Sequence, residues 1–377
     1  MESVLLTTTY TGFNYGTSLQ ALAGKYIISK LGYSCNFVRP KSLVKGRDIR
    51  IGKLVQILGR AIWLGQIKEL LPFIDSYKKK FVEGTESKFF EYNHLFLEPK
   101  ELNWHEMKEA AKKTVACVAG SDQIWISVAL YVDPIYYLRF APSYKRIAFA
   151  PSFGRDFIAE YNKRKIAKWV NEIKYLSVRE RSGVSLVKNL TGRTCVQLID
   201  PTLGVSRDEW IDLLGIKEGK KDYILTYFLD APSEYAKNQL TVLKENLKCE
   251  VVNVPYIFDD MSFCDRVTCA GPKEFLELIL NAKLVCTDSF HGSAFSINFQ
   301  TPFFVFERMY GSATKQSARI LSLLQKFHLE SRYEDKISLS HWDKIEFESV
   351  DAILTQERLK IYEFLENSIN DIKKHRH

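Results

Sequence analysis

The sequence lacks the features by which several large protein classes are recognised. None of its apolar runs reaches the roughly 18 uninterrupted residues of a membrane-spanning helix. The opening stretch MESVLLTTTYTGFNYG has no basic region and too short an apolar run for a signal peptide. HExxH, GxSxG, GxGxxG, P-loop and EF-hand patterns are absent, so nothing supports the enzyme and calcium-binding classes that they mark.

Cysteine pairs with metal-binding or redox spacing are also missing. The seven cysteines are scattered, form no CxxC pair, and several lie inside strand-like apolar runs. This distribution is typical of reduced, buried thiols in a cytosolic protein. No cluster of histidine and carboxylate has clear metal-ligand spacing. We therefore expect a cytoplasmic protein without a bound metal.

The chain is basic, but its charges are mixed along the sequence. The formal net charge is +8, which favours an anionic partner. There is no long run of arginine and lysine and no nucleic-acid-binding motif, so we expect no nucleic acid partner. An anionic small molecule fits this pattern best.

Strand-like and helix-like runs alternate along the chain, which predicts an α/β protein with parallel sheets covered by helices on both faces. The charged stretch GIKEGKKD divides the chain, so we expect two Rossmann-like domains, 1–214 and 215–344, facing a central cleft. Residues 51–113 are predicted to form a mainly helical insertion in the first domain. Residues 345–377 are predicted to form a helix that crosses back to the first domain, followed by a basic tail.

The most apolar segment is IGKLVQILGRAIWLGQIKELLPFI, residues 51–74. Charged residues interrupt it at helix-compatible spacing, which favours an amphipathic helix packed on a core. The alternative is a basic amphipathic surface that sits on a membrane or covers a lipid-linked substrate.

Polar residues follow four of the predicted strands, at the edge where open α/β sheets bind ligands. Each also has a purely structural interpretation as a helix cap, a turn or a solvated ion pair. At a related strand end, Asp200 is interpreted as the cap of the turn before Pro201. The four sets are Asn14, Tyr15 and Gly16; Ser121, Asp122 and Gln123; Arg179; and Ser289 and His291.

His291 is the strongest of these candidates. It stands between TDSF and a helix-like run, where a strand passes into a helix. The positive end of a helix favours the neutral imidazole, which can take a proton from a hydroxyl group and return it. Arg179, at another strand end, can hold a carboxylate or a phosphate through two hydrogen bonds.

Six segments in the same order resemble the polysaccharide pyruvyl transferase family, and they span about residues 4–332. They are NYGTSLQALA, AGSDQIW, LSVRERSG, IDPTLG, TDSFHG with PFFVF, and SARILSLLQKFHLESR. The resemblance implies a GT-B-like pair of domains and transfer of the enolpyruvyl unit of phosphoenolpyruvate onto a sugar. The product would be a pyruvate ketal on a bacterial surface polysaccharide or its lipid-linked precursor, with release of phosphate and no cofactor.

The resemblance also suggests roles for the candidate residues. His291 would act as general acid and base, and Arg179 would hold the donor. Asn14, Tyr15 and Gly16 with Ser121, Asp122 and Gln123 would line the first-domain wall, beside the glycan acceptor. Some family members have an arginine two positions before the histidine, where this chain has Ser289. Another cation must then hold the donor phosphate, and the candidates are Arg308, Lys315 and Arg319.

Two other functions remain open at this stage. A glycosyltransferase of the same architecture, using a nucleotide sugar, would also need a cationic site and a base. A non-catalytic carbohydrate-binding relative would keep the fold without the chemistry. Contact with the inner face of the membrane is an open alternative for any of the three.

Overall fold

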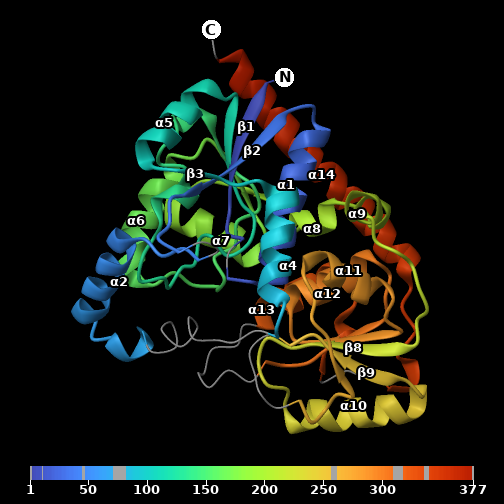
Figure 1. The fold of residues 1–377 in the computed structure, drawn as a ribbon. Helices are drawn as coiled ribbons and strands as arrows, with labels where there is room; N and C mark the ends of the chain where they lie inside the picture. Colours follow the sequence, from blue (N-terminus) through green and yellow to red (C-terminus); the bar gives the residue numbers. More distant parts are fainter. Residues whose placement is uncertain are drawn as a thin grey trace.

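The computed structural model describes residues 2–10, 12–44, 47–70, 82–255, 261–308, 317–334 and 339–375. Two parallel sheets, each covered by helices, lie on either side of residues 215–222 (Figure 1). The expected pair of Rossmann-like domains is thereby confirmed. Among the residues that the structure describes, none of the helices is both long enough and apolar enough to cross a membrane.

The first sheet has the strand order β3-β2-β1-β4-β5-β6-β7, with all strands parallel. The strand β1 pairs on both sides, with Val4 opposite Cys35 of β2 and Ala116 of β4. Strands buried on both faces need continuous apolar sequence, as in VLL and ACVA. The strands are β1 (Ser3–Thr7), β2 (Ser34–Pro40), β3 (Lys100–Leu102), β4 (Ala116–Ala119), β5 (Arg146–Ala148), β6 (Tyr175–Val178) and β7 (Val196–Gln197).

The helices that belong to this half of the chain cover both faces of the first sheet, and α1 also contacts the second domain. They are α1 (Tyr15–Lys30), α2 (Ile51–Trp63), α4 (Thr85–Tyr92), α5 (Trp104–Lys113), α6 (Glu160–Asn171), α7 (Arg181–Thr191), α8 (Pro201–Gly204) and α9 (Arg207–Leu214). Short helical turns are η1 (Ile67–Glu69), η2 (Asn93–Leu97), η3 (Pro134–Tyr137) and η4 (Ser143–Lys145).

The second sheet has the order β10-β9-β8-β11-β12, again entirely parallel. Its strands are β8 (Tyr223–Tyr227), β9 (Glu250–Asn253), β10 (Arg266–Val267), β11 (Leu284–Thr287) and β12 (Phe303–Val305). Its helices are α10 (Glu234–Leu247), α11 (Pro272–Leu280), α12 (Phe290–Asn298) and α13 (Ser317–Lys326), with turns η5 (Glu330–Arg332) and η7 (Leu339–His341).

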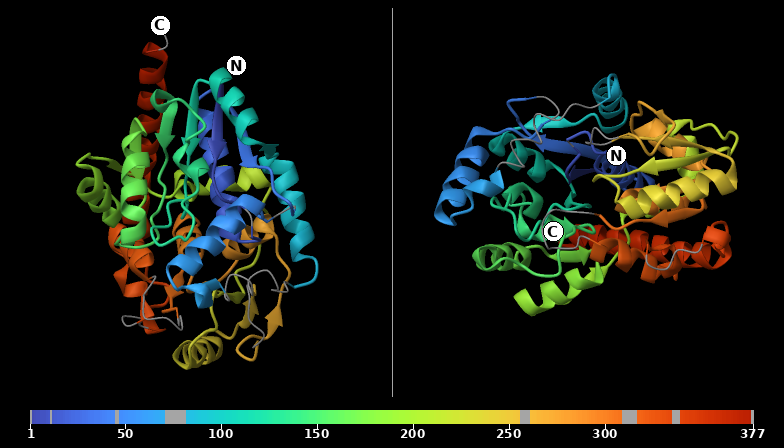
Figure 2. Two further views of the ribbon diagram at one scale, coloured as in Figure 1. Left: turned by 90° about the vertical axis from the view of Figure 1, so that its left-hand side faces the viewer. Right: turned by 90° about the horizontal axis from the view of Figure 1, so that it is seen from below.

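The helix α14 (Phe347–Lys374) runs along both domains, as expected. Near its start, Asp351 accepts a hydrogen bond from Gln300 of the second domain at 2.5 Å. Near its end, Asp371 accepts one from Tyr175 of the first domain at 2.6 Å. The helix therefore ties the two sheets together, and both termini lie at the far end of the first domain (Figures 1 and 2).

Residues 51–113 are mainly helical, as expected, but one of their elements was not predicted and one expectation for them is wrong. The element that was not predicted is β3, whose Lys100 pairs with Val38 of β2. The residues KEL were missed because a short, exposed edge strand carries no apolar run. In addition, α2 is not packed on a core by its apolar face, since Ala61 is its sole buried residue.

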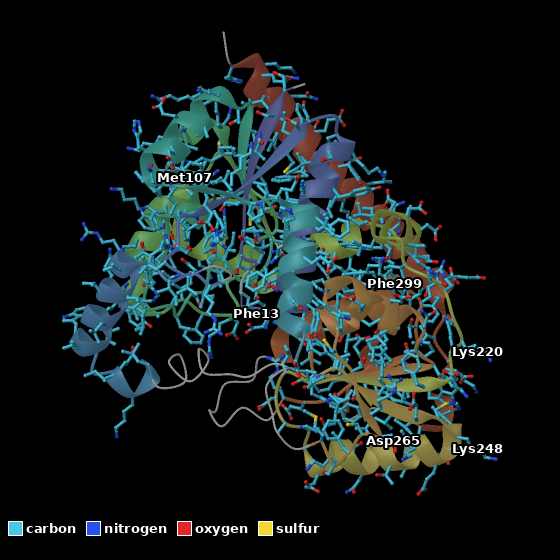
Figure 3. All side chains as sticks on the ribbon, viewed as in Figure 1. Phe13, Met107, Lys220, Lys248, Asp265 and Phe299 are labelled. Atoms are coloured by element: carbon cyan, nitrogen blue, oxygen red, sulfur yellow. The ribbon has the colours of Figure 1, made fainter. Side chains whose placement is uncertain are left out.

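The domains share one apolar core. The largest cluster of buried side chains runs from β1 and α1 through α8 into α11, α12 and α14. Figure 3 shows side chains filling the space between the sheets, with Phe13 on the first-domain side and Phe299 in the second. Because this contact is continuous, the polar residues at the facing strand ends are held in a defined arrangement.

Candidate active site

Each sheet has one point where the strand order reverses. In the first sheet it lies between β1 and β4, and in the second between β8 and β11. Ligands of open α/β sheets bind at such points, beyond the carboxyl ends of the strands. The segments that follow β1, β4 and β11 contain Asn14–Gly16, 120–123 and 288–291, so the two reversal points bring three of the predicted sets together.

His291 lies in the first turn of α12 and reaches the first domain. Its side chain is buried, and its ring lies against Gly16 at the start of α1. A β-carbon on Gly16 would stand 1.9 Å from the His291 Nδ1 atom. No side chain fits there, so glycine is required by the close approach of the imidazole. Asn14 fixes this start of α1, because its side chain accepts a hydrogen bond from Thr17 N at 3.2 Å.

Asp200 stands on the other side of the imidazole. Its Oδ2 atom is 3.8 Å from His291 Nε2, which is too long for a hydrogen bond but close for two charges. The same oxygen accepts from Arg179 Nη1 at 2.6 Å, and Oδ1 accepts from Thr202 N at 3.0 Å. Burial would raise the pKa of Asp200, but His291 and Arg179 outweigh it and hold the pKa below its usual range.

Arg179 is surrounded by carboxylates. Besides Asp200, its Nε atom donates to Glu180 at 2.8 Å, and Nη1 lies 3.6 Å from Asp122. Its guanidinium also lies 4.3 Å from the centre of the Phe290 ring. Burial opposes the charged form, yet Glu180, Asp200 and Asp122 together raise the pKa of Arg179 above its usual value. Most of its charge is therefore already compensated.

Two buried nitrogen atoms of this cluster have no hydrogen-bond partner among the described residues. They are His291 Nε2, from the second domain, and Arg179 Nη2, from the first. Buried polar groups are nearly always hydrogen-bonded in folded proteins, and exceptions often occur where a ligand binds. These two nitrogen atoms therefore mark a place where an oxygen atom of a substrate could form the missing hydrogen bonds.

Arg308 and Arg319 bring further positive charge from the second domain. Arg308 Nε donates to Asp288 Oδ2 at 3.0 Å, which ties it to the end of β11. Arg319 is half-buried and donates to the Gln123 side chain when that amide turns its oxygen toward the guanidinium. Burial, and then the nearby charge of Arg179, lowers the pKa of Arg319 to about 10.

A family model described as polysaccharide pyruvyl transferase matches residues 14–308. This match covers most of the chain. The protein belongs to the polysaccharide pyruvyl transferase family. The matched range contains His291, Arg179, Asp200 and Gly16, and Arg319 lies just beyond it.

Solved structures of other proteins are similar to this pyruvyl transferase family member at low identity. The UDP-GlcNAc 2-epimerase of Methanocaldococcus jannaschii is 12% identical, with 95% of this chain and 94% of that chain covered and a TM-score of 0.46. MurG of Acinetobacter baumannii is 10% identical, with 99% and 100% covered and a TM-score of 0.41. No match was found among curated proteins.

The hydroxyl groups of three predicted site residues form hydrogen bonds within the protein. Ser289, where some members of the pyruvyl transferase family have arginine, caps α12 by accepting from Gly292 N at 3.3 Å. Ser121 is completely buried and donates to Ala150 O at 2.5 Å. Tyr15 donates to Ala270 O at 3.0 Å across the domain contact. All three residues are buried, and their expected contacts with a substrate stay predictions.

Four other candidates belong to one group of charges. Arg319 of the second domain interacts electrostatically with Arg308 of the same domain and with Arg179 and Asp122 of the first, and Arg179 lies 3.6 Å from Asp122. Lys315 lies outside the described residues. Within the described part of the chain, no group of histidine, cysteine and acidic residues is arranged to hold a metal ion.

Sequence reasoning undervalued two residues that build the site. Asp200 was interpreted as a turn cap, but its Oδ2 atom also accepts a hydrogen bond from Arg179 and lies near the imidazole of His291. Gln20 was not singled out, although its Oε1 accepts from Ser121 N at 2.9 Å and its amide group donates to Thr9 O at 2.7 Å. A glutamine inside the otherwise apolar helix LQALAG was the available signal.

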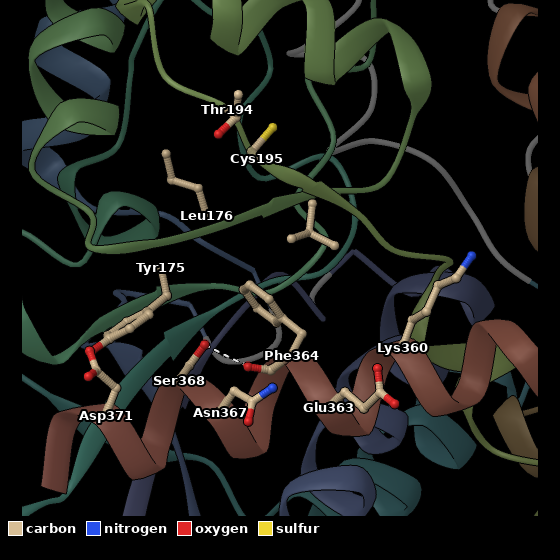
Figure 4. Close-up of a pocket in the computed structure, with 11 residues that line it drawn as sticks. Tyr175, Leu176, Thr194, Cys195, Lys360, Glu363, Phe364, Asn367, Ser368 and Asp371 are labelled. Carbon is tan, nitrogen blue, oxygen red and sulfur yellow. Dashed lines mark hydrogen bonds between the residues drawn. The ribbon is translucent and has the colours of Figure 1, made fainter. Parts of the chain in front are cut away.

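A surface hollow of about 560 Å³ lies elsewhere, between α14 and the strands β6 and β7 (Figure 4). Tyr175, Cys195 and Phe364 line it, and Ser368 donates to the Phe364 carbonyl at 2.6 Å. It contains no arginine and none of the predicted site residues. Its lining has one basic residue, Lys360, against two acidic ones, Glu363 and Asp371, which does not favour a strongly anionic donor.

Proposed function

We propose that this protein transfers the enolpyruvyl unit of phosphoenolpyruvate to a sugar of a bacterial surface polysaccharide or of its lipid-linked precursor. The product is a pyruvate ketal across two sugar hydroxyls, and phosphate is released. The observation that carries this proposal is the buried imidazole of His291, held between Gly16 and Asp200 where the two reversal points meet. Membership of the polysaccharide pyruvyl transferase family supports the reaction class.

The arginines of the site suit the donor. Phosphoenolpyruvate is a small anion with a carboxylate and a phosphate, and guanidinium groups bind both through charge-assisted hydrogen bonds. Arg319 is the better candidate for the phosphate, because burial and Arg179 already disfavour its charged form. A bound anion would offset that cost. The unpartnered Nη2 of Arg179 is then available to the donor carboxylate.

The reaction moves two hydroxyl protons. The first sugar oxygen bonds to C2 of the donor, and one proton ends on the methylene carbon, which becomes a methyl group. The C–O bond to phosphate then breaks, the second sugar oxygen bonds to the same carbon, and its proton leaves with the phosphate. A positioned imidazole can accept a hydroxyl proton and return it, and we assign this part to His291.

Asp200 has a positioning role in this scheme. When His291 takes a proton, the imidazole becomes a cation beside an ionised, buried carboxylate. That arrangement stabilises the cation and holds the ring, as carboxylates do for catalytic histidines in other enzymes. Contacts of this kind are often long without substrate and shorten in the complex, which fits the 3.8 Å separation.

The test is to incubate the protein with phosphoenolpyruvate and a panel of galactosyl, mannosyl and glucosaminyl acceptors. The expected result is release of phosphate together with a mass gain of one pyruvate ketal on an acceptor. Release of a nucleoside diphosphate from a nucleotide sugar, without consumption of phosphoenolpyruvate, would instead identify a glycosyltransferase. Acceptor binding without any turnover would identify a non-catalytic relative.

A further inference from the structure

Exposed apolar side chains are concentrated in one part of the molecule. Of the 18 large apolar side chains that are exposed among the described residues, eight lie between residues 43 and 67. Monomeric proteins rarely gather such residues without a partner for them. The eight are Leu43, Val44, Ile51, Val55, Leu58, Ile62, Trp63 and Ile67.

Half of them form a stripe on α2. Ile51, Val55, Leu58 and Ile62 follow one another at intervals of four, three and four residues, which places them on one face of a helix. Trp63 ends the helix with 73% of its surface exposed. An amphipathic helix normally turns this face to the core, and here it is turned to solvent.

The side of α2 that carries Lys53 and Arg60 holds the helix to the protein. Arg60 donates to Tyr161 O at 2.5 Å, and its guanidinium lies 4.7 Å from the centre of the Tyr161 ring. Lys53 donates to Asp48 at 2.5 Å, and Arg50, just before the helix, pairs with Asp133. These contacts explain why the apolar face is left outward.

Basic residues flank the stripe. Tyr161 belongs to α6, which therefore lies beside α2 (Figure 1). That helix carries four basic residues and one acidic residue, Glu160, and α2 carries two basic residues and no acidic one. Arg164, Lys165 and Lys168 of α6 are exposed. An apolar stripe beside a cationic surface is complementary to an anionic lipid interface.

We propose that α2 docks in the plane of an anionic membrane, with its apolar face among the lipid acyl chains and α6 against the headgroups. Its 13 residues span about 20 Å at 1.5 Å per residue, so it is too short to cross a bilayer core of about 30 Å. Docking does not depend on the proposed reaction, although it would bring the site toward a lipid-linked acceptor.

A second copy of the chain is a less suitable occupant. In a two-fold symmetric contact the same patch meets itself, so the cationic helices α6 would be brought toward each other. Like charges across an interface are unfavourable, whereas an anionic bilayer attracts the same residues. The charge pattern therefore favours lipid.

Flotation with vesicles tests this proposal without phosphoenolpyruvate or any acceptor. One set of vesicles contains phosphatidylcholine alone, and the other contains phosphatidylglycerol as well. The wild-type protein should float with the anionic vesicles and remain behind with the neutral ones. The double variant Val55→Glu/Leu58→Glu should lose at least nine-tenths of the bound fraction, whereas Val242→Glu, at an exposed position of α10, should bind as wild type does.

A second variant keeps the test independent of the fold of α2. Arg164→Gln/Lys168→Gln leaves the stripe intact and should bind more weakly, with a smaller dependence on salt concentration. Failure of the wild-type protein to float with anionic vesicles would overturn the proposal. So would equal binding by the stripe variant and Val242→Glu, or a wild-type dimer that the stripe variant converts to a monomer.

Discussion

Helices α2 and α12 are similarly apolar in composition but occupy opposite environments. All nine residues of α12 are buried, whereas α2 buries Ala61 alone. The polar residues of α12 are small or form hydrogen bonds inside the protein, as Ser293 and Ser296 do. The charged residues of α2 instead gather on the side that faces the protein.

The difference shows that apolar content does not decide where a helix lies. Buried on all sides, α12 holds His291 in one place, which a proton carrier requires. Held by a few polar contacts, α2 presents its apolar face outward. Changes in α12 and around it should therefore abolish catalysis, while changes on α2 should affect only what the protein binds.

The largest effect is expected from replacing the proton carrier. His291→Asn should lower kcat by about 10²- to 10⁴-fold, the usual contribution of general acid–base catalysis. His105→Asn, at an exposed position of α5, is the matched control and should retain full activity. Phosphate release from phosphoenolpyruvate measures both. Wild-type turnover by His291→Asn would remove His291 from the mechanism.

The next effect is expected where α12 meets the first domain. Gly16→Ala places a β-carbon on His291 and must displace the ring, so kcat should fall by about 10²-fold. Gly59→Ala is the control, since a β-carbon there meets open space on α2. Gly59→Ala should leave kcat unchanged and raise the free energy of unfolding by about 0.5–1 kcal/mol. Equal kcat values for the two variants would show that the contact between Gly16 and the His291 ring does not contribute to catalysis.

Asp200→Asn should weaken both stability and turnover. Removing one partner of a buried ion pair costs about 3–5 kcal/mol. Because the folded-state pKa of Asp200 lies below its unfolded value, its contribution is present above about pH 4 and is lost as the pH falls further. Melting curves from neutral to acid pH should therefore converge for wild type and variant. Parallel curves would contradict this, and exposed Asp212→Asn should match wild type.

Arg319→Gln tests which cation replaces the arginine absent at Ser289. Loss of a charge-assisted hydrogen bond, worth about 1.5–3 kcal/mol, should raise KM for phosphoenolpyruvate about ten- to a hundred-fold. KM for the acceptor should not change. Arg266→Gln, on the outer edge strand β10, should leave both constants as they are. An effect confined to the acceptor would place Arg319 on the other substrate.

The smallest effect is expected at the domain contact. Tyr15→Phe removes the hydrogen bond to Ala270 O and should lower the free energy of unfolding by about 1 kcal/mol. The aromatic ring at position 15 can still stack on Phe275, as it does in the wild type with 4.5 Å between the ring centres, so activity should be retained. Thermal melting and a rate assay, with exposed Tyr144→Phe as control, give the comparison. A large loss of activity would mean that this hydroxyl touches substrate.

Much of the fold was predictable because buried parallel strands leave continuous apolar runs in the sequence. The strands β3 and β10 were not predictable, because KEL and RV are short, exposed strands at the edges of their sheets. In the site, His291 stood out as a histidine where an apolar strand passes into a helix. The requirement for glycine at position 16 could not be seen in the sequence. It depends on His291, about 275 positions away, which only the packing of the two domains brings close.

The most direct test measures phosphate release and ketal formation in one reaction, with phosphoenolpyruvate, an acceptor that the panel identifies, and either wild-type protein or His291→Asn. The proposed function predicts equal amounts of phosphate and ketal from the wild type and rates of both that are at least about 10²-fold lower from the variant, with unchanged melting temperature. Phosphate without ketal, or a ketal formed equally well by His291→Asn, would contradict it.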